Sequence, residues 1–154
     1  MLLIPTPFTA SLPSSPNLVT MLLEECSSRR LSVSLALEIA ETEFAWENYL
    51  KSFAASSDPV AGRMLETVRA IWGQIKERIA NCPLPITQPT AEGAIQLAWD
   101  TGGLYLDVDV LPQGGVHWYF RDRVTNEVLG TDEEPLETLP STFFDKLIKL
   151  TQSY

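Results

Sequence analysis

Residues 94–130 read AIQLAWDTGGLYLDVDVLPQGGVHWYFRDRVTNEVLG, and apolar and polar side chains alternate along most of this stretch. Strict alternation places one class of side chain on each face of a β-strand. Residues 100–103 and 112–114, which contain Gly, interrupt the alternation where turns are expected. The stretch therefore predicts an antiparallel β-meander of three strands, with a short fourth strand at residues 127–130.

The Pro-Gln-Gly segment at residues 112–114 predicts the register of the second hairpin. Pro suits the first position of a turn, and Gly suits the left-handed position of a three-residue loop with a bulge. This loop sets Leu111 opposite Gly115, and a two-residue loop would place apolar positions opposite polar ones. The expected apolar pairs are Val110 with Val116, Val108 with Trp118, and Leu106 with Phe120.

The first hairpin is expected to pair Trp99 with Leu104 and Leu97 with Leu106, which keeps the apolar side chains on one inner face. An open sheet of three or four strands is not stable alone, so other segments must cover that face. The sequences on both sides of the meander have the apolar periodicity to do so.

The same register gathers polar and aromatic side chains on the outer face. It sets Asp109 opposite His117, and it brings tyrosine and arginine, which are enriched at interface hot spots, onto the same surface. This outer face is either solvent-facing or a recognition surface. Its candidate binding residues are Tyr105, Asp107, Asp109, His117, Tyr119 and Arg121.

Helices are predicted before the meander. Residues 1–15 should be extended, and their apolar side chains should dock on the body of the protein or on a partner. Ser15-Pro16 and Asp58-Pro59 each combine a capping residue with a Pro at the first helical position. They start helices that end near residues 27–30 and at Asn81. Between them, a second helix is expected from residue 32 or 34 to about 55, with a short strand at residues 31–37 as the competing interpretation.

The remaining segments complete an α+β prediction. Residues 82–93 are a Pro-rich crossover that cannot be helical, and residues 131–154 form an acidic loop and a short helix with a capping box from Thr142 to Asp145. We expect two to three N-terminal helices, packed on one face of a three- to four-stranded meander. The predicted domain spans residues 16–154, with helices at 16–81 and the meander at 94–130.

The charge is strongly acidic and is concentrated in the second half. The chain has 154 residues and a formal net charge of −9. Residues 1–82 carry 7 basic and 9 acidic side chains, whereas residues 83–154 carry 4 and 11, a net charge of −7. Such a field repels phosphate backbones, so nucleic acid is not an expected partner. It would suit a partner with a basic surface, although solubility alone also explains it.

Two cysteines, Cys26 and Cys82, lie far apart, and one His cannot complete a Cys/His zinc set. Free thiols are typical of the reducing cytoplasm, where we expect the protein. The first residues lack a basic segment, and Pro5 and Pro7 interrupt the apolar run, so a signal peptide is not predicted. No stretch approaches transmembrane length, and no membrane partner is expected.

The catalytic interpretation depends on the pair Asp109–His117, which is half of a nucleophilic triad. It lacks a nucleophile with a recognisable sequence context, since Cys82, Ser141 and Thr101 lie in none of the known motifs. A cross-strand ion pair is the simpler prediction. Asp107 and Asp109 could bind a hard cation, but there is no EF-hand loop. The glycines match no phosphate-binding motif. We therefore predict no catalytic residue, metal or cofactor.

The sequence favours a small acidic cytoplasmic protein that is not an enzyme and acts through protein interaction. It would be an inhibitor, an immunity-type protein or an accessory subunit, using the outer face of the meander. The alternative is a small enzyme or ligand-binding protein with a site around Asp109, His117 and Tyr119. A homodimer, formed through a sheet edge or the apolar N-terminal segment, also stays open.

Overall fold

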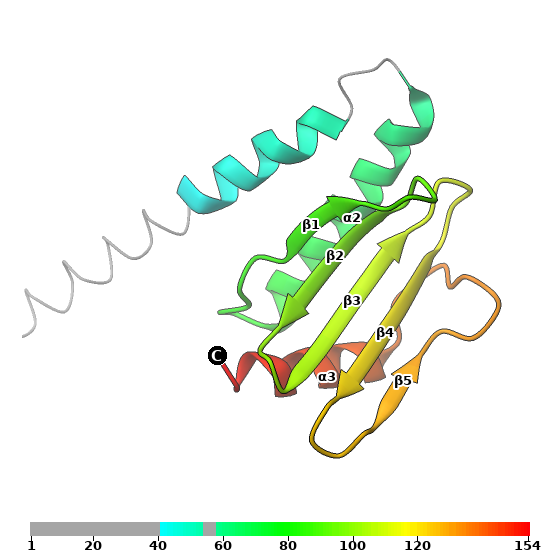
Figure 1. Cartoon of the computed structure of the whole chain (residues 1–154). Helices are drawn as coiled ribbons and strands as arrows, with labels where there is room; N and C mark the ends of the chain where they lie inside the picture. Colours follow the sequence, from blue (N-terminus) through cyan, green and yellow to red (C-terminus); the bar gives the residue numbers. More distant parts are fainter. Residues whose placement is uncertain (1–40, 54–57) are drawn as a thin grey trace, which may run out of the picture. The chain divides into compact units, whose positions relative to one another are not determined.

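A computed structural model describes residues 41–53 and 58–154 (Figure 1). The extended segment predicted at residues 1–15, the helix predicted from residue 16, the competing strand at 31–37 and Cys26 lie outside the described residues. Contacts divide the chain into two compact units, Met1–Phe44 and Ala45–Tyr154. The prediction of one domain over residues 16–154 stays a prediction.

The described part is α+β, with an antiparallel sheet of five strands in the order β1-β2-β3-β4-β5 (Figure 1). Consecutive strands are neighbours, so the sheet is a simple meander. The prediction of three to four strands was therefore wrong by at least one strand. The strands are β1 (Ile86–Pro89), β2 (Ile95–Asp100), β3 (Leu104–Val110), β4 (Val116–Asp122) and β5 (Val128–Gly130).

The missed strand is β1, which lies within the segment predicted to be a Pro-rich crossover. It pairs with β2 from Ile86 opposite Ala98 to Pro89 opposite Ile95. Pro lacks a backbone N–H, and it is tolerated in a sheet only at an edge, which is where β1 lies. A turn at residues 90–94 joins the two strands, and Gly93 adopts a left-handed φ of 83° there.

The predicted register is confirmed for the β3–β4 hairpin and wrong for β2–β3. Leu106 faces Phe120, and the amide N–H of Leu111 donates to the carbonyl of Gly115, as the three-residue loop requires. In the first hairpin, Trp99 faces Leu106 instead of Leu104. The two registers differ by two residues, so both keep the same side chains on the inner face.

Three helical segments occur among residues 41–53 and 58–154. Residues 41–53 are helical, which confirms the described part of the second predicted helix. Helix α2 (Pro59–Arg78) begins at the predicted cap, where the Asp58 carboxylate accepts a hydrogen bond from the Val60 N–H at 2.9 Å. Helix α3 (Ser141–Thr151) has Pro140 at its N-cap and no side-chain cap. The capping box predicted from Thr142 to Asp145 is therefore not formed.

Helices α2 and α3 lie on the same side of the sheet, behind it in Figure 1. Their apolar faces meet the inner face of the sheet in one buried cluster. Phe143 of α3 packs edge-on against both inner tryptophans, Trp99 and Trp118, with ring centroids 6.5 and 5.9 Å apart. The largest side chains with almost no exposed surface include Trp99, Phe120, Phe143, Leu50, Ile75 and Leu97.

Polar contacts fix the helices at the edges of this core. The Trp46 indole N–H donates to Oγ1 of Thr87 at 2.9 Å, which links helical residues of the second unit to β1. At the other edge, Lys149 of α3 forms a 2.8 Å ion pair with Asp122 at the end of β4. Of the described helices, neither α2 nor α3 covers the outer face of the sheet (Figure 1).

Candidate functional site

The candidate recognition residues belong to the outer face of the two central strands. The register sets Asp109 opposite His117, as predicted, and the predicted β3–β4 register also sets Asp107 opposite Tyr119 and Tyr105 opposite Arg121. Because β1 and β2 continue the sheet, the side chains of Gln88 and Gln96 extend the same face, and they hydrogen-bond to each other at 2.8 Å. The outer face is thus wider than the sequence suggested.

Asp107 is the centre of a hydrogen-bond network on this face. Its Oδ2 accepts a 2.7 Å hydrogen bond from the Tyr105 hydroxyl and a 3.2 Å hydrogen bond from the Gln96 amide. Only 9% of Asp107 is exposed, although it lies on the face that neither α2 nor α3 covers. Its two hydrogen-bond partners, Tyr105 and Gln96, lie on the same face.

Burial changes the acid–base properties of the network. It raises the pKa of Asp107 to about 6, and the negative charge of Asp109 adds to this effect. Burial also raises the pKa of Asp109 and, together with the hydrogen bond to Asp107, that of Tyr105. A buried carboxylate is expensive to ionise without a cation, so these two acids favour the approach of positive charge.

The expected Asp109–His117 ion pair is not among the salt bridges formed by the part of the chain that the structure describes. Instead, Oδ1 of Asp109 and Nε2 of His117 are both buried, and neither has a hydrogen-bond partner. Buried polar atoms normally have partners, because an unmade hydrogen bond costs about 1–3 kcal/mol. This end of the hairpin therefore has unused hydrogen-bonding capacity.

Aromatic rings occupy the middle of the outer face. The rings of Tyr105 and Tyr119 are partly exposed and lie 6.2 Å apart, tilted by 56°. Arg123, which was absent from the predicted set, places its guanidinium 5.7 Å from the Tyr105 ring and holds Asp100 through two hydrogen bonds. Arg123 follows the last residue of β4, so the alternation along the strand did not place it on the outer face. Arg121 is exposed.

Apolar groups border this face as well. Ile86 on β1 is 66% exposed, and Val128 on β5 is 55% exposed. Ile86 faces Ala98, and Val128 faces Arg121, so both lie on the outer side of the sheet. Neither residue was among the predicted binding residues. Ile86 belongs to β1, which was not predicted, and Val128 lies in the short strand β5 at the edge of the sheet.

The nucleophiles considered from the sequence are not placed to complete a triad. Thr101 lies in the turn before β3, whereas Asp109 is near the other end of that strand, several residues away at about 3.3 Å per residue. Ser141 begins α3, on the inner side of the sheet. Burial raises the pKa of the Cys82 thiol to about 12, so it is not a thiolate at neutral pH.

Two further findings concern the kinds of function open to this site. Among residues 41–53 and 58–154, no group of three or more His, Cys, Asp or Glu side chains is arranged to hold a metal ion. Within the same residues, every helix is too short or too polar to cross a membrane.

Comparison with known proteins adds no assignment. The chain matches no family model, no curated protein and no solved structure. Its function must therefore be argued from its own geometry.

Proposed function

We propose that this protein is a non-enzymatic interaction or regulatory protein that binds a partner protein through the outer face of its sheet. The observation that carries this proposal is the partly exposed Tyr105–Tyr119 pair at the centre of a face that neither α2 nor α3 covers. Tyrosine supplies a large contact area at a small cost in conformational entropy, and it is enriched at interface hot spots.

The carboxylates on this face favour a partner with a basic surface. Asp107 and Asp109 flank the tyrosines, and the carboxylate of Asp109 has an oxygen without a hydrogen-bond partner. A lysine or arginine from the partner would offset the cost of keeping these carboxylates ionised in a partly buried site. The exposed Ile86 and Val128 would lie towards the rim of the same interface.

The test is affinity capture with the full chain, followed by reconstitution with the purified partner. The double variant Tyr119→Ser/Arg121→Glu changes the outer face, and Tyr154→Ser/Arg63→Glu makes matched changes at exposed positions elsewhere. We expect the first variant to lose the partner, and the second to bind as the unmodified chain does. Recovery of no partner, or equal loss with both variants, would contradict the proposal.

One observation favours a second candidate, a ligand site at Asp109 and His117. Both side chains have a buried polar atom without a partner, and a small polar ligand could satisfy both. Fragment screening with the His117 ring resonances as the probe would test this candidate. Ligands that shift these resonances saturably would support it, and a screen with no such ligand would count against it.

A further inference from the structure

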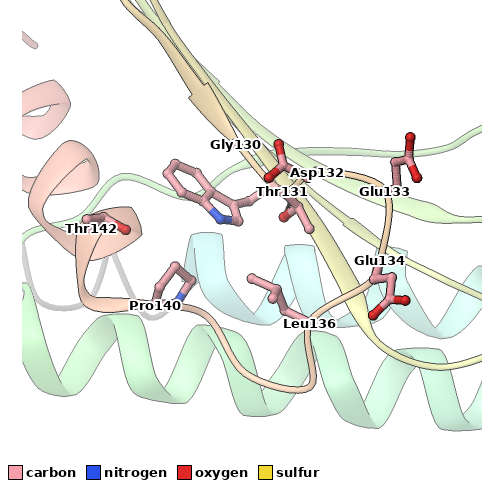
Figure 2. A pocket seen from close by; sticks show the side chains of 9 residues that line it. Gly130, Thr131, Asp132, Glu133, Glu134, Leu136, Pro140 and Thr142 are labelled. Carbon is pink, nitrogen blue, oxygen red and sulfur yellow. Dashed lines mark hydrogen bonds between the residues drawn. The ribbon is translucent and has the colours of Figure 1, made fainter.

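A second surface lies away from the outer face, beyond β5. It is an open hollow of about 780 Å³ between the end of β5, the loop at residues 131–136 and the start of α3. Figure 2 shows Leu136 and Pro140 below it, Thr142 at the side of α3, and Asp132 beside Thr131. The sequence analysis treated this region only as an exposed acidic loop.

The lining of the hollow is divided by polarity. Trp118, Leu136 and Pro140 supply apolar surface, and Asp132, Glu133 and Glu134 supply three consecutive carboxylates. No lysine, arginine or histidine lines it. None of the three acids forms an ion pair with the other described residues. Lysine and arginine side chains match such a lining, because an apolar stem carries a cationic head.

An unused donor lies in the same place. Trp118 is only 6% exposed, and its backbone N–H donates to Thr131, but its indole N–H has no hydrogen-bond partner among the described residues. Unlike Nε1 of Trp72, the indole nitrogen of Trp118 is not fully enclosed. Since Trp118 lines the hollow, a carbonyl oxygen bound there can accept this hydrogen bond.

The start of α3 adds to this polarity. The helix begins at Ser141 without a side-chain cap, and Pro140 and Thr142 line the hollow. The N-terminus of a helix carries partial positive charge and attracts acceptors, so this end favours a carbonyl group and opposes a cation. The hollow therefore has an acceptor-binding end and a cation-binding end.

We propose that this hollow docks a basic peptide segment of a partner protein. A backbone carbonyl of the segment accepts from the Trp118 indole N–H, and a neighbouring lysine or arginine reaches the carboxylates of residues 132–134. This surface is separate from the Tyr105–Tyr119 face, so it does not depend on the function proposed above.

The test uses the full chain labelled with ¹⁵N and the acetylated, amidated pentapeptide Gly-Arg-Ala-Arg-Gly as the probe. The indole signal of Trp118 and the amide signals of Gly130 and Thr131 should shift saturably with this peptide. They should shift little with the neutral peptide Gly-Gln-Ala-Gln-Gly.

Two triple variants remove the same charge at different places. Asp132→Asn/Glu133→Gln/Glu134→Gln should weaken binding of the peptide about ten-fold, as expected when partly exposed ion pairs with its arginines are lost. Glu66→Gln/Glu77→Gln/Asp145→Asn changes exposed acids of α2 and α3, and it should weaken binding much less. All six substituted residues are exposed, so both variants should fold.

Three results would overturn the proposal. The first is the absence of a saturable shift at Trp118 and Gly130. The second is equal weakening by the two triple variants, which would indicate only a general charge effect. The third is equal or tighter binding of spermidine at the same signals, which would make the hollow a polyamine site.

Discussion

Asp107 is buried, and its carboxylate accepts two hydrogen bonds. Its burial makes the stability of the protein depend on pH. Its pKa is about 6 in the folded state, against an ordinary value of 3.8. Between these values the folded state binds more protons than the unfolded state, so the free energy of unfolding falls as the pH rises. The stabilising contribution of protonated Asp107 is complete below about pH 4, and it is lost as the pH rises through 6.

The substitution Asp107→Asn should remove this dependence, because the amide keeps an oxygen for the Tyr105 hydroxyl and does not ionise. Relative to the unmodified chain, the free energy of unfolding of the variant should rise by up to roughly 2 kcal/mol as the pH is raised from 4 to 7.5. Urea unfolding at both pH values measures the gain.

Asp100→Asn is the matched control for this experiment. Its hydrogen bonds with Arg123 lower the pKa of Asp100, so its contribution is present above the ordinary pKa and is lost as the pH falls. The effect of this control should therefore have the opposite sign. A stability difference between Asp107→Asn and the unmodified chain that is equal at pH 4 and pH 7.5 would contradict the assignment.

Gly130 is required for a different reason, the close approach of two backbones. A Cβ atom there would lie 2.6 Å from the carbonyl oxygen of Trp118. That carbonyl also accepts from the Thr131 N–H, so the backbone cannot move away cheaply. Gly130→Ala should lower the free energy of unfolding by about 1–3 kcal/mol. At Gly103, where a Cβ would meet nothing within 4 Å, the same change should have a much smaller effect. Equal denaturation midpoints for the two variants would count against this account.

At the scale of elements, the hairpins show what the sequence could and could not predict. The β3–β4 register followed from the Pro112-Gln113-Gly114 loop, because only one loop length kept apolar side chains together. In β2–β3 a shift of two residues preserves the faces, so periodicity could not distinguish the two registers. There the turn chemistry decided, since the Asp100 carboxylate accepts from the Gly102 N–H and the Thr101 N–H donates to Leu104.

The strand β1 and the unpaired polar atoms of Asp109 and His117 were both missed because they depend on the three-dimensional arrangement. Pro85 precedes β1 and Pro89 is its last residue. Prolines normally exclude a central strand, and only the three-dimensional arrangement shows that β1 is an edge strand. The six candidate residues could be assigned to one face by alternation. The burial of Asp107 and the lack of an Asp109–His117 ion pair among the described residues could not be predicted, because they depend on side-chain packing.

The N-cap of helix α2 allows a quantitative prediction of how much one capping residue stabilises the protein. Asp58 satisfies the Val60 N–H, which would otherwise lack a partner at the start of the helix. Asp58→Ala should lower the free energy of unfolding by about 1 kcal/mol, whereas Asp58→Asn should retain most of it. Chemical denaturation of both variants measures the difference. Equal losses would show that charge, not the hydrogen bond, matters here.

For the molecule as a whole, the members of the buried cluster among residues 41–53 and 58–154 belong to the second unit. Its members run from Leu50 to Leu150, and Trp46 packs against it. A fragment of residues 45–154 should therefore fold and unfold cooperatively, as followed by circular dichroism and urea denaturation. A shorter fragment, residues 58–154, loses Leu50 and the Trp46–Thr87 hydrogen bond, and it should be clearly less stable. Equal stability of the two fragments would contradict this description of the core.

The two edge strands of the sheet, β1 and β5, affect whether the protein aggregates in a concentrated solution. β1 ends in Pro89, which cannot donate a ladder hydrogen bond, and β5 has only three residues before the acidic loop begins. Natural sheets use prolines, short edge strands and charge to prevent edge-to-edge aggregation. Joining two copies through β5 would also bring two runs of carboxylates together. Copies of this chain should therefore resist association through β1 and β5, and these two edges of the folded sheet should stay closed to fibre growth.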